Sequence, residues 1–214
     1  KAVAQGDPDA MYDLAHLYEK GKGVVQSSKK AAELFTMAAE QGDVKGMYNL
    51  ALFYEKGHGV VQSFEKTAEL YTMAAEQGHV KAMFNLGCMY RDGKGVVQSF
   101  KKAAELFTMA AEQGDVQAMT NLGTLCIRGH GVDQSNELAR KWLTKAANEG
   151  DESAINNLKV LDKIEGKSTT TAPTPATSPP SICCSSCNKP QPSTRKFHRC
   201  MGCRTVQYCN KECQ

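Results

Sequence analysis

The sequence lacks long apolar runs and any large excess of charge of one sign. No stretch of its 214 residues approaches the run of about 18 apolar residues that a membrane-spanning helix needs, so we expect no membrane partner. The formal net charge is +3 at pH 7 and 23% of the residues are charged, both ordinary values for a globular chain.

The sequence also lacks the residue patterns of common catalytic sites. It holds no paired carboxylate pocket, no nucleophile–base pair and no glycine-rich phosphate loop. We therefore predict that these residues perform no catalysis of their own.

Cysteine is scarce over most of the chain and dense near its end. Cys88 and Cys126 stand alone in the first 182 residues, and we predict that both are small buried apolar residues. The other seven cysteines fall between Cys183 and Cys213. Such a cluster indicates either disulfide bonds or a metal site.

Internal repetition is what the sequence has in abundance. A Gln-Gly pair and a Gly-x-Gly-Val motif both recur every 36 residues without an insertion. Residues 41–76 and 77–112 are identical at 24 of 36 positions, which chance does not produce. Residues 1–6 match the end of such a unit, so we expect the sequence to begin inside a longer protein.

Each unit is predicted to contain two helices with marked ends. An aspartate N-cap precedes the first helix of each unit except one, where His79 takes its place. A serine N-cap precedes each second helix, and Gly21 and its equivalents can close the first helices in the left-handed conformation. We predict that residues 151–164 form one further first helix, which covers the last exposed face.

Apolar residues follow helical spacing within each unit. In the first unit they include Ala10, Met11, Leu14, Leu17 and Tyr18. One helix pair cannot bury such a stripe, so the units must stack into an all-α solenoid. We predict that the repeated methionines fill its core; they are Met11, Met37, Met47, Met73, Met83, Met109 and Met119.

The units share the pattern A-x-x-x-L-[AG]-x-x-Y-x-x-G-x-G-V followed by K-A-x-E-L-[FY]-x-x-A-A-E-Q-G. This pattern resembles the Sel-one-like repeat, a relative of the tetratricopeptide repeat. The match covers residues 1–164 and departs most in the fourth unit, where Cys126 replaces the tyrosine and Trp142 a leucine. The resemblance implies an α-solenoid that binds other proteins, in the form of extended peptide segments.

One polar position per unit forms a ladder along the first helices, at Asp13, Asn49, Asn85 and Asn121. In the solenoids that this chain resembles, the first helices line the concave face, so these side chains could hydrogen-bond the backbone of an extended peptide. The equally weighted alternative is that each amide bonds to the neighbouring repeat. Tyr48 and Phe84 stand at a position that varies between units, where we expect ligand specificity to lie.

The composition changes abruptly after the repeats. Residues 168–181 hold only Ser, Thr, Ala and Pro, with no charged side chain. Such a segment cannot bury a core, so we predict a flexible linker over residues 165–181. A proline-motif ligand is the weaker alternative, because no basic residue closely flanks the prolines.

Six of the late cysteines form three close pairs. Two pairs have the spacing C-x2-C and one has C-x3-C, and such spacings place two thiolates on a tetrahedral Zn²⁺. Disulfide bonds would be strained in this arrangement. We therefore predict zinc as a cofactor and a reducing compartment, the cytoplasm or the nucleus. The pairs are Cys184 with Cys187, Cys200 with Cys203, and Cys209 with Cys213.

The cysteine spacings, ending in T-V-Q-Y-C-N-K-E-C-Q, resemble a MYND-type zinc finger over residues 182–214. The resemblance implies that a first zinc ion is held by Cys184, Cys187, Cys209 and Cys213. Cys200 and Cys203 would begin a second site, which the family completes with a downstream His and Cys, so we expect an incomplete finger. The resemblance implies binding to proteins, so we expect a protein partner rather than nucleic acid despite the basic residues of this segment.

Together these features predict a non-enzymatic intracellular adaptor. The solenoid would bind one protein and the zinc finger another. The alternative is the interaction region of a larger regulatory enzyme, or of a transcriptional corepressor-type protein, whose catalytic part lies outside the sequence.

Overall fold

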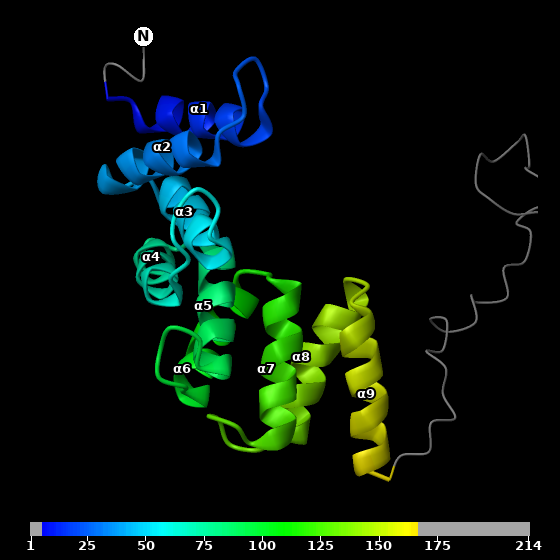
Figure 1. Ribbon diagram of the computed structural model, residues 1–214. Coiled ribbons are helices and arrows are strands. Elements are labelled where there is room, and N and C mark those ends of the chain that lie inside the picture. The colour runs from blue at the N-terminus through cyan, green and yellow to red at the C-terminus, as the bar shows by residue number, and fades with distance from the viewer. Residues whose placement is uncertain (1–5, 167–214) are drawn as a thin grey trace, which may run out of the picture. The chain divides into compact units, whose positions relative to one another are not determined.

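The computed structural model describes residues 6–166, and all the regular structure in this range is α-helical. Nine helices of 13 residues each follow one another within the described range (Figure 1). They are α1 Pro8–Lys20, α2 Ser28–Glu40, α3 Val44–Lys56, α4 Phe64–Glu76, α5 Val80–Asp92, α6 Phe100–Glu112, α7 Val116–Arg128, α8 Asn136–Asn148 and α9 Glu152–Ile164. The predicted pairs of helices are confirmed.

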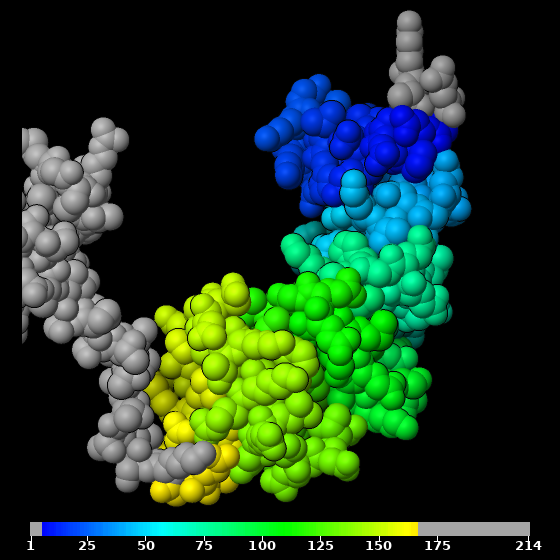
Figure 2. All heavy atoms as spheres, turned by 180° about the vertical axis from the view of Figure 1, so that it is seen from behind, coloured from blue at the N-terminus to red at the C-terminus, as the bar shows by residue number. Residues whose placement is uncertain are grey.

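The helices pack in chain order. Each first helix packs against the second helix of its own unit, and each second helix packs against the first helix of the next unit. Figure 1 shows α3 and α5 on the inner side of this row, with α4 and α6 outside them, and Figure 2 shows the repeats following one another in order. We call the exposed side of α1, α3, α5, α7 and α9 the first-helix face. The exposed side of α2, α4, α6 and α8 is the second-helix face.

The helix ends follow the predicted capping residues. The Ser63 hydroxyl accepts a hydrogen bond from the Lys66 backbone N–H, and the equivalent serines act in the same way. Gly57 closes α3 in the left-handed conformation, with φ +69°. His79 is also an N-cap, because its Nδ1 accepts a hydrogen bond of 3.2 Å from the Ala82 N–H. The histidine thus keeps the capping role that aspartate has in the other units.

Small residues bring the helices of a pair close together. Ala15 and Ala51 are completely buried, and glycine takes their place in the third and fourth units. A Cβ on Gly87 would lie only 2.7 Å from Cε1 of Phe107, and one on Gly123 only 2.6 Å from Cγ of Leu143. The aromatic or aliphatic side chain of the second helix therefore occupies the space that a side chain on the first helix would need.

The loop inside each unit contacts the preceding unit. Gly95, in the loop between α5 and α6, has φ +65°, and a Cβ there would overlap the backbone carbonyl of Phe64 at the start of α4. Gly59 and Gly131 meet the starts of α2 and α6 in the same way. The second glycine of the Gly-x-Gly-Val motif is thus required by a contact between repeats as well as by its backbone conformation.

The predicted core is right for most positions and wrong for four. Met11, Met47, Met83 and Met119 are at most 8% exposed. Three methionines of the second helices are 43–46% exposed, because the buried stripe of α2 passes through Leu34, Phe35 and Ala38 and misses position 37. Leu17 is also exposed, at 41%. The three exposed methionines are Met37, Met73 and Met109.

The predicted terminal helix is confirmed as α9. It packs against α8 and α7, where Ala154 and Leu161 are completely buried. Its other side leaves Val160 and Ile164 half exposed. No helix among residues 6–166 is long and apolar enough to cross a membrane.

Candidate functional site

The predicted ladder lies on the first-helix face, but its members differ in what they bind. The Asp13 side chain is exposed and makes no hydrogen bond within residues 6–166. Asn49 donates from Nδ2 to the Lys45 carbonyl of its own helix, at 2.8 Å. These two positions therefore leave carboxylate or amide oxygens open to a ligand.

The later ladder positions bond to the preceding repeat. Asn85 donates from Nδ2 to the Tyr71 hydroxyl of α4, at 3.0 Å. Asn121 accepts on Oδ1 a hydrogen bond from Nη1 of Arg91, which lies on α5. The alternative that the sequence left open therefore holds for these two asparagines, and their amides help to join the repeats.

The next member of the ladder, Asn157 on α9, was not predicted from the sequence. Its Nδ2 donates to the Thr124 hydroxyl of α7 at 3.1 Å. The signal was present, since Asn157 stands 36 residues after Asn121. Arg91 was missed as well, because the earlier units have Glu19 and Glu55 at its position.

The aromatic residues beside the ladder are anchored on the second helices. Tyr48 stacks on His79 with ring centres 4.5 Å apart and lies 5.7 Å from the Tyr71 ring. Phe84 packs on Phe107 at 5.8 Å. Both Tyr48 and Phe84 are partly buried, so part of each side chain remains exposed while these contacts hold the ring in place. Such pre-organised aromatic side chains lose little entropy when a partner binds.

The Tyr71 hydroxyl links the two helices of the second unit. The Tyr71 hydroxyl donates to Oε2 of Glu55 at 3.2 Å. Burial is the main cause that raises the pKa of Tyr71, and the nearby Glu55 carboxylate raises it further. Burial also raises the pKa of Tyr48. Both phenols therefore remain neutral hydrogen-bonding groups at physiological pH.

The cysteine on this face is not a reactive thiol. Cys88 on α5 is partly buried, which corrects the prediction of a fully buried residue, whereas Cys126 is completely buried as predicted. Burial raises the pKa of Cys88 to about 11, although Arg91 opposes the shift. The thiol is therefore protonated at neutral pH and contributes apolar surface rather than a nucleophile.

A cavity of about 410 Å³ with a mixed polar and apolar lining lies beside Asn121, where the third and fourth units meet. Arg91 lines it and is already paired with Asp92, at 2.8 Å, and with Asn121. Arg128 and His130 also line the cavity, and no ion pair forms at either within residues 6–166. The cavity therefore has an excess of basic groups next to the ladder.

All six predicted zinc ligands lie beyond residue 166. Cys184, Cys187, Cys200, Cys203, Cys209 and Cys213 all lie outside the described residues, as do the predicted linker beyond residue 166 and the predicted finger. Within residues 6–166, no group of three or more His, Cys, Asp or Glu side chains is placed to hold a metal ion. The zinc site therefore stays a prediction.

The fold and the ladder define a class of protein, a solenoid of helix–turn–helix repeats. Four consecutive matches to the Sel1 repeat, at residues 8–43, 44–79, 80–115 and 116–151, cover more than half of the chain. The chain belongs to the Sel1 repeat family. Proteins built from this repeat are typically scaffolds for protein–protein interactions.

Solved structures agree with this assignment. The chain is similar to a protective antigen of uropathogenic Escherichia coli that displays an SLR fold, with a TM-score of 0.73 and 32% identity over 77% of this chain. It is also similar to a Sel1 repeat protein from Oxalobacter formigenes, with a TM-score of 0.69 and 34% identity over 72% of this chain. The chain spans 35% and 63% of the lengths of these two proteins. None of the curated proteins matches it significantly.

Proposed function

We propose that this protein is a non-enzymatic adaptor whose first-helix face binds an extended segment of another protein. The observation that carries the proposal is the ladder with its adjoining aromatic residues, repeated every 36 residues. Asp13 and Asn49 offer unused oxygens to the backbone N–H groups of a peptide, and Tyr48 and Phe84 offer partly exposed rings that are held in place by their neighbours. A peptide running along this face would meet a ladder position in each repeat and an aromatic side chain beside it in the first three repeats.

The basic side chains of the cavity beside Asn121 favour a bound segment that carries an acidic group. Arg128 and His130 line it together with the Arg91–Asp92 pair. A carboxylate of the partner would add a charge-assisted hydrogen bond there, a stronger interaction than one between neutral groups. The proposed ligand is therefore an extended segment with an acidic residue at one end.

The cysteine cluster supplies the second half of the proposed adaptor. Zinc held by Cys184, Cys187, Cys209 and Cys213, with a second site begun at Cys200 and Cys203, would form a MYND-type finger that binds another protein. Thiolate ligands require a reducing environment, so we place this function in the cytoplasm or the nucleus. The solenoid and the finger would then each hold one partner at the same time.

The ladder is tested by the variant Asn49→Ala. Once a partner is isolated with the whole chain and its binding segment is mapped, titration calorimetry should show about tenfold weaker binding, because a hydrogen bond to the peptide backbone is lost. Asn156→Ala is the matched control, since Asn156 is exposed on α9 outside the ladder. Unchanged affinity in both Asn49→Ala and Asn121→Ala, with helicity intact, would show that the ladder does not bind the partner.

A further inference from the structure

The second-helix face carries two grooves that repeat each other residue by residue. One lies between α2 and α4 over α3, and the other lies between α4 and α6 over α5. Each encloses about 290 Å³, which is small for a drug-sized ligand but large enough for a side chain of a partner. Every residue that lines the second groove stands 36 positions after one that lines the first.

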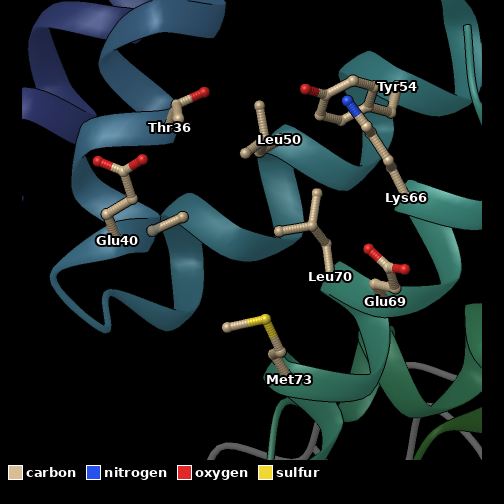
Figure 3. Close-up of a pocket in the computed structure, with 9 residues that line it drawn as sticks. Thr36, Glu40, Leu50, Tyr54, Lys66, Glu69, Leu70 and Met73 are labelled. Atoms are coloured by element: carbon tan, nitrogen blue, oxygen red, sulfur yellow. The ribbon is translucent and has the colours of Figure 1, made fainter.

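The interior of each groove is apolar and open. In the first groove, Leu50 of α3 and Leu70 of α4 point into the space between α2 and α4, and Met73 closes one end (Figure 3). Met73 and its equivalent Met109 are 45% and 46% exposed. Flexible thioether side chains at such a position adapt to the shape of an entering side chain. Burial of an apolar group in each groove would therefore be favourable.

Acidic groups border both grooves. Figure 3 shows Glu40 on α2 and Glu69 on α4 at opposite sides of the first groove. Lys66 lies over the Tyr54 ring, 5.0 Å from its centre, rather than in an ion pair. No ion pair within residues 6–166 involves Glu40 or Glu69. The rim thus carries net negative charge and complements a basic partner.

The fourth unit reverses this chemistry at the same positions. Lys141 and Lys145 replace the groove glutamate and the exposed methionine, and Trp142 replaces the groove leucine. The Trp142 ring is only 7% exposed, with Nζ of Lys145 4.7 Å from its centre. Among residues 6–166, the apolar and acidic character of these positions therefore ends after α6, and the fourth unit provides a natural template for removing it.

The distance between the grooves indicates the form of the occupant. They are separated by the thickness of α4, about 10 Å for a helix with its side chains. A polyproline II segment returns to the same face every third residue after about 9 Å, and its backbone needs no internal hydrogen bonds. Aromatic-lined grooves suit such segments, and Tyr54 and Tyr90 line these two.

We propose that the two grooves together bind a basic polyproline II segment of another protein, with one apolar side chain in each groove. Basic residues at the ends of the segment meet Glu40 and Glu69 in the first groove and Glu76 and Glu105 in the second. This surface is formed mainly by α2, α4 and α6, and the residues that it uses on α3 and α5 are not those of the ladder. It therefore allows the solenoid to hold a second partner at the same time.

The probe is a fluorescein-labelled peptide, Arg-Pro-Leu-Pro-Pro-Leu-Pro-Arg, whose leucines stand three positions apart. Fluorescence anisotropy with the whole chain should show saturable binding that weakens as salt is raised. Replacing the leucines by serine, or the arginines by glutamate, should weaken binding by about tenfold or more. No binding of the parent peptide, or equal binding of all three peptides, would overturn the proposal.

The protein variants copy the fourth unit. The double variant Met73→Lys, Met109→Lys should weaken peptide binding about tenfold or more, with circular dichroism unchanged because both side chains are exposed. Met37→Lys is the matched control, since Met37 is equally exposed at 43% but lines neither groove. Equal loss in the control would overturn the proposal.

Two further measurements distinguish the peptide site from the ladder and from a dimer interface. Asn49→Ala should leave binding of this peptide unchanged, so failure of the ladder hypothesis and failure of the groove hypothesis are distinguishable. Sedimentation of the chain alone tests a second copy as the occupant. Self-association that the double methionine variant abolishes would assign the grooves to a dimer instead, and would overturn the proposed peptide site.

Discussion

His79 stands where the other first helices begin with an aspartate, and it caps α5 only while its Nδ1 is unprotonated. The ring is held by stacking on Tyr48, and its nitrogen accepts from the Ala82 N–H. Burial lowers the pKa of His79 below its ordinary value of 6.5, and the nearby Lys81 lowers it further. His79 thus makes the junction between α4 and α5, in the middle of the solenoid, sensitive to pH. An aspartate at this position would not do so.

We predict that the solenoid loses stability as the pH falls below about 6.5. The unfolded chain binds the His79 proton more tightly than the folded chain, so stability from this group is complete above 6.5 and is lost as the pH falls towards the lower folded pKa. Urea unfolding of the whole chain at about pH 7.5 and about pH 5 measures the effect.

The variant His79→Asp should show a smaller drop between these two pH values, because an aspartate cap stays ionised over this range. In His58→Gln the full drop should persist, since His79 is still present. A drop of equal size in wild type and His79→Asp would assign the pH dependence to other groups.

At the scale of elements, every helix described has the same length, and contacts between loops and helices set the register of the repeats. Gly95 shows how, because its loop lies against the first peptide group of α4. Gly78, between α4 and α5, shares a positive φ, +87°, but a Cβ there would meet nothing within 4 Å. Substitution of Gly78 therefore tests backbone strain alone, whereas substitution of Gly95 tests backbone strain together with the contact between repeats.

We predict that Gly95→Ala destabilises the solenoid more than Gly78→Ala does. The left-handed conformation alone should cost Gly78→Ala about 1–2 kcal/mol. Gly95→Ala should cost about 3 kcal/mol or more, because its methyl group overlaps a peptide group that cannot move aside. Thermal or urea unfolding followed by circular dichroism compares the two, and equal losses would contradict the contact between repeats.

At the scale of the whole molecule, the solenoid of repeats accounts for its own stability. Its core runs without a break from Met11 on α1 to Leu161 on α9, and none of the groups in residues 6–166 is placed to hold a metal ion. The predicted finger is the opposite case. A segment of about 30 residues buries too little apolar surface to fold without a metal or disulfides.

We predict that chelation unfolds the finger and leaves the repeats intact. Structural zinc contributes on the order of 10–16 kcal/mol in small fingers. EDTA should therefore release zinc from the whole chain while its helical circular dichroism signal stays almost constant. Cys184→Ser should lower the zinc content, and Cys88→Ser is the matched control that should not. Cooperative loss of the entire helical signal on chelation would contradict two independent modules.

Local chemistry explains why the fold was largely predictable and the site only partly so. Asp7, Ser27 and Gly21 act where the repeat places them, because caps depend on neighbours a few residues away. The exposure of Met73 and Met109 could not be predicted, since helical spacing does not reveal which flank of a wide apolar stripe faces a gap between helices. The partners of Asn85 and Asn121 were equally hidden, because both belong to the preceding repeat.

The sequence by itself determined the nature of this protein: a stack of 36-residue helix pairs, whose amphipathic stripes cannot be buried unless the units stack. Only the tertiary structure decided which polar groups remain open to a partner. Asn85 is tied to Tyr71, whereas Asn49 is bonded only within its own helix. The grooves beside α4 are likewise a product of stacking. Periodicity specifies which residues share a face, but the spaces between faces exist only once the repeats have packed.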